Sequence, residues 1–307
     1  MCNKKISFST GRLQAMYGDM RAVEIAAEIG ADAIDFDTCG QQFDYRKPDS
    51  IFSKSDQEIV AYFTAIKQRA DELGLIIGQT HGRIASFKPD PEWNEAEIKN
   101  ARLDCLVAKT LGAPICIMHA VSTIWFGPDT DPQYMRDLNF KWFTSVLPFA
   151  KQYGIKIATE TFGDAPKYGC VDFFGDIDEF LKSYHRVCAV DDFKDYFVMC
   201  MDTGHCNKAT RFNNNPSPAD AIRMLGSNIK ALHLNDNNTL LDQHKIPLTG
   251  CIDWEDTLNA LDEIGYDGTY NMELNLAWFG PELAVDTAAF AIKVLRNLLN
   301  KHYNQNS

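Results

Sequence analysis

The sequence has little of what would place it among nucleic-acid-binding or membrane proteins. Its 30 lysines and arginines are outnumbered by 42 aspartates and glutamates, which gives a formal net charge of −12. An acidic surface repels a polyphosphate backbone, and this argues against nucleic acid as a partner. No apolar run reaches the roughly 18 residues that a membrane-spanning helix needs, so we expect no membrane association.

Three further absences narrow the class of protein. The nine cysteines are scattered and form no CxxC pair, and Cys116 and Cys200 lie in apolar, strand-like runs, as buried and reduced cysteines do. The first residues, MCNKKISFSTGRL, lack the apolar stretch of a secretory signal. Neither GxxxxGK[ST] nor GxGxxG occurs, so we expect no nucleotide cofactor. Together these features predict a cytoplasmic protein.

The chain does contain one pattern that is repeated eight times. Short apolar runs typical of strands alternate with segments of helical periodicity. The predicted strands are residues 6–10, 33–37, 75–81, 114–119, 155–160, 197–202, 229–234 and 268–273. The predicted helices are residues 20–29, 57–73, 95–111, 134–153, 177–187, 218–225, 254–264 and 283–303.

This alternation predicts an α/β protein with a (β/α)8 TIM barrel fold. Four helix-to-strand boundaries carry a glycine, which can take the left-handed conformation that ends a helix. No Gly/Ser/Pro-rich linker divides the series, so we expect one domain over residues 1–307. A doubly wound sheet with an extra domain is the alternative. The four glycines are Gly74, Gly112, Gly154 and Gly265.

Acids and imidazoles gather at or just after the carboxyl ends of the predicted strands. In a barrel these ends converge on one mouth, where active sites form, so we expect these side chains to face one small space. The other two histidines, His185 and His302, lie in predicted helices and are expected at the surface. The residues of the mouth are His81, His119, Glu160, Asp202, His205, His233, Asp236, Asp242, His244 and Glu273.

A divalent metal ion explains this gathering best. Any one of these residues alone is more simply a helix cap or a loop hydrogen-bonding group. Bunched carboxylates, however, would repel one another and lose hydration unless a cation compensated their charge. Carboxylate oxygen and imidazole nitrogen are also the ligands that suit zinc, manganese, iron and cobalt.

At these residues the chain resembles the xylose isomerase-like TIM barrels. That superfamily includes sugar phosphate isomerases and epimerases, ketose 3-epimerases, inosose dehydratase and the apurinic endonuclease IV family. The resemblance covers essentially the whole chain and does not identify the reaction. The segments that carry it are ATETFGD around Glu160, MDTGH with Asp202 and His205, LHLNDN with His233, LDQHKIPLTGCIDW with Asp242 and His244, and NMELN with Glu273.

The isomerase branch implies one divalent ion (Mn, Zn, Co or Mg) bound by Glu160, Asp202, His233 and Glu273. The ion would polarise the carbonyl and an adjacent hydroxyl of an open-chain sugar. Glu160 and Glu273 would then remove and return a proton, and His205 would stabilise the enediolate. A metal-dependent isomerase or epimerase of a sugar or sugar phosphate is therefore the favoured function. Ketose 3-epimerases carry an arginine where this chain has Thr239, which speaks against that narrower assignment.

The endonuclease IV branch implies a three-zinc cluster with more ligands. The chain has a candidate at each position, so His81, His119, Asp242 and His244 are predicted as additional metal or substrate ligands, and up to three ions are allowed. A multi-zinc phosphodiester hydrolase is the first alternative function. An inosose dehydratase-like lyase is the second, and a non-catalytic carbohydrate-binding barrel is the third.

The remaining predictions concern the substrate and the assembly. Trp125 and Phe162 follow predicted strands and would form an apolar wall against one face of a small-molecule sugar, or simply pack the loops at the barrel mouth. Arg83 would bind a phosphate or carboxylate of the substrate, or form a surface salt bridge. A homo-oligomer is left open, because no apolar patch can be identified from the sequence.

Overall fold

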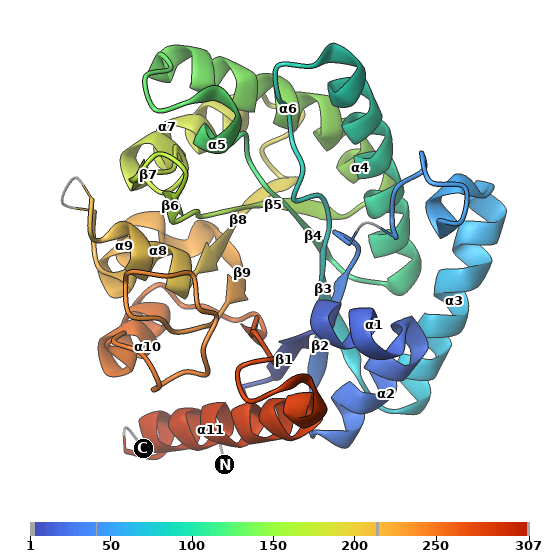
Figure 1. Ribbon diagram of the computed structural model, residues 1–307, viewed down its shortest axis with the longest axis vertical. Coiled ribbons are helices and arrows are strands. Elements are labelled where there is room, and N and C mark those ends of the chain that lie inside the picture. Colours follow the sequence, from blue (N-terminus) through green and yellow to red (C-terminus); the bar gives the residue numbers. More distant parts are fainter. Residues whose placement is uncertain (1–3, 41, 213–214, 306–307) are drawn as a thin grey trace.

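Eight parallel strands form a barrel at the centre of the molecule (Figure 1). The computed structural model describes residues 4–40, 42–212 and 215–305. Strands that follow one another along the barrel are paired, and the ring closes where Leu234 bridges to Met272. In order around the barrel, the strands are β1 (Ile6–Ser9), β2 (Ala33–Asp37), β3 (Ile76–His81), β4 (Ile115–Met118), β5 (Lys156–Glu160), β8 (Phe197–Asp202), β9 (Ile229–His233) and β10 (Tyr270–Met272).

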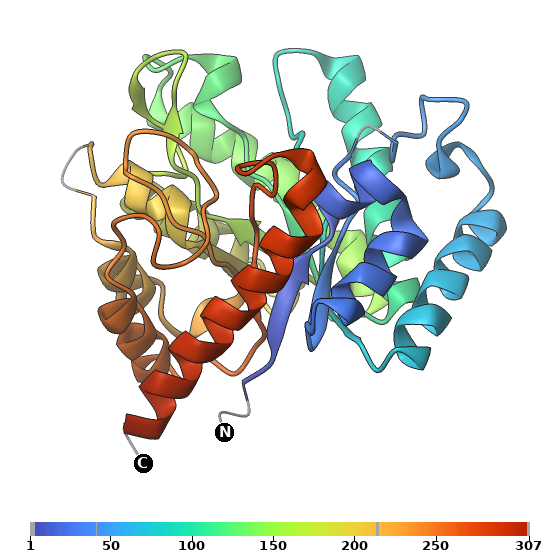
Figure 2. The same ribbon diagram turned by 60° about the horizontal axis from the view of Figure 1, so that its bottom comes forward.

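Helices surround this barrel (Figure 1), and α11 runs alongside β1 (Figure 2). No helix among the described residues has the length and apolarity needed to cross a membrane. The longer helices are α2 (Asp19–Glu28), α3 (Asp56–Glu72), α4 (Pro91–Leu111), α6 (Pro132–Tyr153), α7 (Ile177–Cys188), α9 (Pro218–Leu225), α10 (Trp254–Glu263) and α11 (Ala284–Gln305). The predicted (β/α)8 barrel is confirmed.

Local sequence signals set the ends of these helices. Ser55 caps α3 in a capping box, in which its side chain accepts from the backbone of Glu58 and Glu58 accepts from the backbone of Ser55. Gly112 and Gly154 end α4 and α6 with φ of 72° and 68°, a left-handed conformation that other residues adopt at a cost. Each helix can therefore stop directly before a strand.

The core has two parts. A large apolar cluster fills the space between strands and helices, with Trp142, Phe143 and Phe197 among its fully buried members. A smaller cluster consists of strand residues only and lies inside the barrel: Ile115, Ile117, Ala158, Val198, Cys200 and Ala231. Cys116 and Cys200 are buried as predicted, and all eight described cysteines are free thiols.

The structure adds elements that were not predicted and corrects one residue. The additions are short: α1 (Gly11–Tyr17), α5 (Thr123–Phe126), α8 (Thr203–Ala209) and a hairpin of β6 (Asp164–Ala165) with β7 (Cys170–Val171). The surface position predicted for His302 is wrong. Its ring is only 9% exposed, because it packs under α10 with its Nε2 2.7 Å from an oxygen of Asp262.

Candidate metal centre

Four strands bring acidic and imidazole groups together at the mouth of the barrel. Glu160, Asp202 and His233 are the last residues of β5, β8 and β9, and Glu273 directly follows β10. The first three are fully buried. One donor atom from each of the four residues lies within 4.8 Å of every other. The convergence expected from the sequence is therefore present.

A hydrogen-bond chain fixes the orientation of the His233 ring. Its Nε2 lies 3.1 Å from Oδ2 of Asp35, a fully buried carboxylate on β2. We infer that Nε2 carries the proton, because a carboxylate accepts a hydrogen bond. The lone pair of Nδ1 then faces Oε1 of Glu160 at 2.9 Å and Oε2 of Glu273 at 3.4 Å. A carboxylate behind a histidine in this way is typical of metal sites.

The donor spacing fits a divalent ion. Bonds of about 2.1 Å place neighbouring ligand atoms about 3 Å apart and opposite ones about 4.2 Å apart. The separations of 2.9 and 3.4 Å around His233 correspond to neighbouring ligands. Asp202 is held ready in the same manner, because its Oδ2 accepts from Asn235 at 2.9 Å and its Oδ1 accepts from the backbone of His205 at 2.7 Å. The residues present therefore suit a metal ion.

Two more imidazoles lie on the other side of Glu160. Nε2 of His119 is 2.9 Å from Oε2 of Glu160, and Nε2 of His81 is 3.4 Å from the same oxygen. The two Nε2 atoms are themselves only 3.2 Å apart. His81 forms a second donor group with Glu160 and His233, so this group shares two residues with the first.

A third donor group is formed by His205, Asp242 and His244. Nδ1 of His205 donates to the carbonyl of Thr161 at 2.9 Å, and Nδ1 of His244 lies 3.1 Å from the carbonyl oxygen of Glu273. Both Nε2 atoms are therefore directed at Oδ2 of Asp242, at 3.6 and 3.4 Å, and would bind a cation once they had lost their protons. His244 has a φ of 44°, a strained backbone that often accompanies a functional position.

The charged groups of the centre shift one another's pKa values. Burial alone would raise the pKa of Glu160, but the imidazoles of His233 and His119 lower it well below its ordinary value. Burial raises the pKa of Asp202 to about 6 even though His205 opposes the shift. Burial disfavours the protonated form of His244, yet Asp242 and Glu273 outweigh it and raise the pKa to about 9. Without a cation, the centre holds protons to balance its negative charge.

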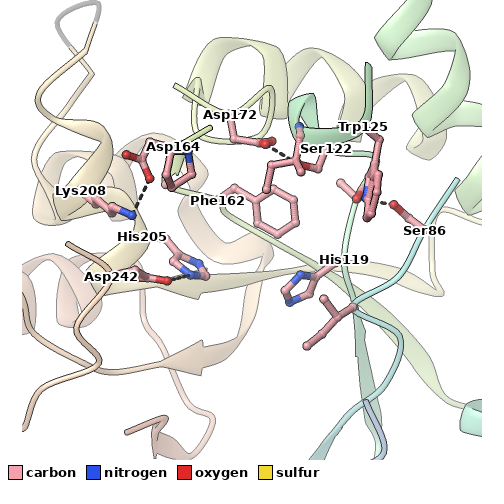
Figure 3. Close-up of a pocket in the computed structure, with 15 residues that line it drawn as sticks. Ser86, His119, Ser122, Trp125, Phe162, Asp164, Asp172, His205, Lys208 and Asp242 are labelled. Carbon is pink, nitrogen blue, oxygen red and sulfur yellow. Dashed lines mark hydrogen bonds and ion pairs between the residues drawn. The ribbon is translucent and has the colours of Figure 1, made fainter. Parts of the chain in front are cut away.

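A cavity of about 400 Å³ opens beside the centre (Figure 3). Phe162 lies between His119 and His205 and turns its ring toward both, with centroid distances of 4.8 and 6.2 Å. Trp125, 54% exposed, lines the same cavity. The apolar wall predicted from Trp125 and Phe162 is thus placed beside the donor groups, although contact with a substrate stays a prediction.

Arg83 and Asp236 have partners within the protein. The Nε of Arg83 donates to Asp104 at 2.7 Å and its guanidinium also donates to the carbonyl of Thr38, and the residue is only 5% exposed. These contacts favour a structural role over the predicted substrate contact, and the salt bridge is buried rather than at the surface. Asp236 does not join the cluster, because its carboxylate accepts from Trp254 and so ties down the loop after β9.

Two further groups near the centre are not among the predicted site residues. Asp35 stands third in the apolar strand AIDFD, where an acid signals a buried partner but not which one. Lys208 is 5% exposed at the cavity, with its Nζ 2.5 Å from Asp164 (Figure 3). Only the folded barrel brings Asp35 within reach of His233, which is 198 residues further along the chain.

Comparison with known sequences yields a match over most of the chain. The profile of a family described as "Xylose isomerase-like TIM barrel" matches residues 23–297. The uncharacterized protein y4fM of Sinorhizobium fredii is 24% identical over 192 residues, which is 61% of this chain and 56% of that protein. The chain spans about half the length of the curated relatives that it matches.

Solved structures share the fold across nearly the full chain. The crystal structure of a D-tagatose 3-epimerase-like protein aligns with a TM-score of 0.72 at 20% identity, over 99% of this chain and 100% of that one. The crystal structure of the IOLI protein with a zinc atom aligns with a TM-score of 0.72 at 18% identity, over 97% of this chain and 99% of that one. At these identities the likeness shows the fold.

Proposed function

We propose a function from one premise: the chain belongs to the family of xylose isomerase-like TIM barrels. The function is that of a metal-dependent isomerase or epimerase, which moves a proton between carbons of an open-chain sugar or sugar phosphate through an enediolate. Solved structures with this fold include a D-tagatose 3-epimerase-like protein and a D-psicose 3-epimerase, which supports sugar chemistry here.

One observation carries the proposal: donor atoms of Glu160, Asp202, His233 and Glu273 lie within 4.8 Å of one another. His119 and His205, which contact Glu160, line a cavity next to them. A divalent ion bound there would polarise the carbonyl and hydroxyl of the sugar and acidify the C–H between them. The cavity of about 400 Å³ is large enough for a monosaccharide, and sites for small molecules commonly start near this size. Phe162 and Trp125 would exclude water from one face of the sugar.

The two glutamates would carry the proton. The imidazoles around Glu160 and Glu273 lower the pKa of each carboxylate despite its burial, so both are ionised at neutral pH and can accept a proton. Glu273 lines a second cavity together with His244, whereas Glu160 faces His119 on the side of the first. A sugar bound across the centre would thus meet one carboxylate on each side.

His205 would stabilise the negative charge that develops on the sugar oxygen. Its Nδ1 is fixed by the Thr161 carbonyl, which leaves Nε2 directed toward the cavity and Asp242. Burial disfavours protonation of this ring, but Asp202 and Asp242 raise its pKa well above the ordinary value. A protonated His205 could therefore donate to an enediolate oxygen.

Deuterium exchange tests this function. The protein is loaded with Mn²⁺, Co²⁺, Zn²⁺ or Mg²⁺ and incubated in D₂O with a panel of ketoses, aldoses and their phosphates. We expect at least one sugar to gain deuterium next to its carbonyl. Glu160→Gln and Glu273→Gln should lose this exchange, and the exposed Glu255→Gln on α10 should keep it. Absence of exchange for all sugars with all four ions, or full exchange in both variants, would contradict the proposal.

A second candidate function has an observation of its own. The donor group His205–Asp242–His244 lies near the main centre, and the group His81–Glu160–His233 overlaps it through Glu160 and His233, as the shared ligands of a multi-zinc phosphodiester hydrolase would. Cleavage of bis(p-nitrophenyl) phosphate or of a DNA duplex with an abasic site, without sugar exchange, would select this function. Loss of water from an inosose under the same conditions would select the lyase.

A further inference from the structure

A thiol lies beside the centre, in a group that the proposed function does not use. Asp37 ends β2 and His81 ends β3, and the register of these paired strands sets the two residues opposite each other. Cys39 follows two residues after Asp37. One donor atom from each of the three, a carboxylate oxygen, a sulfur and a ring nitrogen, lies within 4.8 Å of the others.

The His81 ring has one nitrogen to spare for this group. Its Nε2 is directed at Glu160 and at Nε2 of His119, at 3.4 and 3.2 Å. Its Nδ1 is buried, in a residue only 3% exposed, and makes no hydrogen bond of ordinary geometry among the described residues, although the Cys39 thiol interacts with the ring. A buried polar atom that lacks a full hydrogen bond is destabilising, so a stronger partner is expected on the Nδ1 side.

The backbone of Cys39 holds Asp37 through one carboxylate oxygen. Its Oδ1 accepts from the backbone N–H of Cys39 at 2.7 Å. Its Oδ2 lies over Gly11, where a Cβ atom would stand only 2.1 Å from that oxygen. Glycine at position 11 thus leaves room for the carboxylate, and the backbone contact with Cys39 fixes the thiol and the carboxylate relative to each other.

The group faces open space. Asp37 and Cys39 line a cavity of about 300 Å³ together with Arg12, His244 and Glu273. Phe162 and Trp125 line the other cavity, which meets this one at Ile84. Water or a small ligand could therefore complete a coordination sphere around the three donors.

We propose that Asp37, Cys39 and His81 form a separate binding site for a divalent metal ion, with Nδ1, Sγ and Oδ2 as donors. Zinc suits a mixed set of sulfur, nitrogen and oxygen better than magnesium or calcium does. Three protein donors with a fourth position open to a cavity are typical of zinc sites that bind exchangeable ligands. Burial raises the pKa of the Cys39 thiol to about 12, so uptake of the ion releases a proton from sulfur.

Cobalt substitution tests the site, because only a sulfur ligand gives a thiolate-to-cobalt charge-transfer band. The donors of the main centre are oxygen and nitrogen alone, so this readout is independent of the isomerase proposal. Co²⁺ added to the metal-free protein should produce the band. Cys39→Ser should abolish it and lower the zinc content by one ion per chain, and Asp37→Asn should weaken it. Cys188→Ser, a partly buried cysteine on α7, should leave it unchanged.

A second measurement on the unaltered protein guards against a Cys39→Ser variant that fails to fold. X-ray absorption at the zinc edge of the fully loaded, unaltered protein should show a sulfur neighbour about 2.3 Å from zinc. Absence of a sulfur band in the unaltered protein, its persistence in Cys39→Ser, or a zinc edge without a sulfur neighbour at full loading would overturn the proposal.

Discussion

At the scale of single residues, the contact between Asp35 and His233 is expected to set the metal affinity of the centre. The carboxylate fixes the ring and leaves Nδ1 as the nitrogen that would bind the metal ion. Asp35→Asn keeps the shape but removes the charge, so the affinity for Zn²⁺ or Mn²⁺ should fall about 10- to 100-fold. Competition with a chromogenic chelator measures this. Asp32→Asn, directly before the same strand, is the control, and equal affinities for both variants would refute the role of Asp35.

Arg83 gives a second prediction at this scale. Arg83→Met leaves the carboxylate of Asp104 buried without its partner, which should cost about 3–5 kcal/mol of unfolding free energy. Chemical denaturation measures the loss, and KM for any substrate found should stay within twofold. A raised KM at unchanged stability would instead restore the substrate role predicted from the sequence.

The sequence predicted which residues meet at the mouth but not their partners. Glu160, Asp202, His233 and Glu273 were recognisable because each stands at the end of an apolar strand. Asp35 and Asp37 sit in a strand as well, yet their importance depends on side chains from distant parts of the chain. Asp236 misled for the converse reason, since a charged residue after a strand can turn toward a neighbouring loop as easily as toward the mouth. The substrate contact of Arg83 stays a prediction.

At the scale of elements, the turn from β8 into α8 carries much of the site. Asp202 caps α8 through the backbone of His205, and Gly204 lies between them. A Cβ atom at Gly204 would stand 1.8 Å from Oδ1 of Asn235, whose amide donates to Asp202. This close approach explains the glycine of the MDTGH segment.

Gly204→Ala should therefore act on metal binding through Asn235. The added methyl group pushes the amide away and frees the Asp202 carboxylate, so metal affinity should drop at least tenfold. Isothermal titration with Mn²⁺ measures this, and circular dichroism at 222 nm should show that the helices persist. An unchanged affinity would mean that Asn235 does not position Asp202.

Element boundaries were predictable in part of the repeating series of strands and helices. The strands of residues 33–37 and 197–202 and the helix of residues 218–225 were predicted as they occur in β2, β8 and α9. The short elements α5, β6, β7 and α8 were missed, because they stand outside the eightfold alternation of strand and helix. They lie in the loops at the mouth, where side-chain contacts rather than propensity decide the backbone.

At the scale of the whole molecule, protons and metal ions compete for binding to the acidic and imidazole groups of the barrel mouth. The pKa of His244 is raised to about 9 and that of Asp202 to about 6, so at lower pH both hold protons that an ion must displace. Affinity for a divalent ion should therefore rise steadily from pH 6 to pH 9. Titrations in matched buffers at four pH values measure this, and a flat or falling profile would contradict it.

The most direct test of the account is an anomalous diffraction experiment on crystals grown with Zn²⁺ or Mn²⁺. The account predicts a strong anomalous peak within about 2–2.3 Å of donor atoms from Glu160, Asp202, His233 and Glu273. The peak should vanish in Glu160→Gln. Crystals of the unaltered protein that show no peak between these four side chains, at millimolar metal and neutral pH, would contradict the central claim that the strands converge to hold a cation.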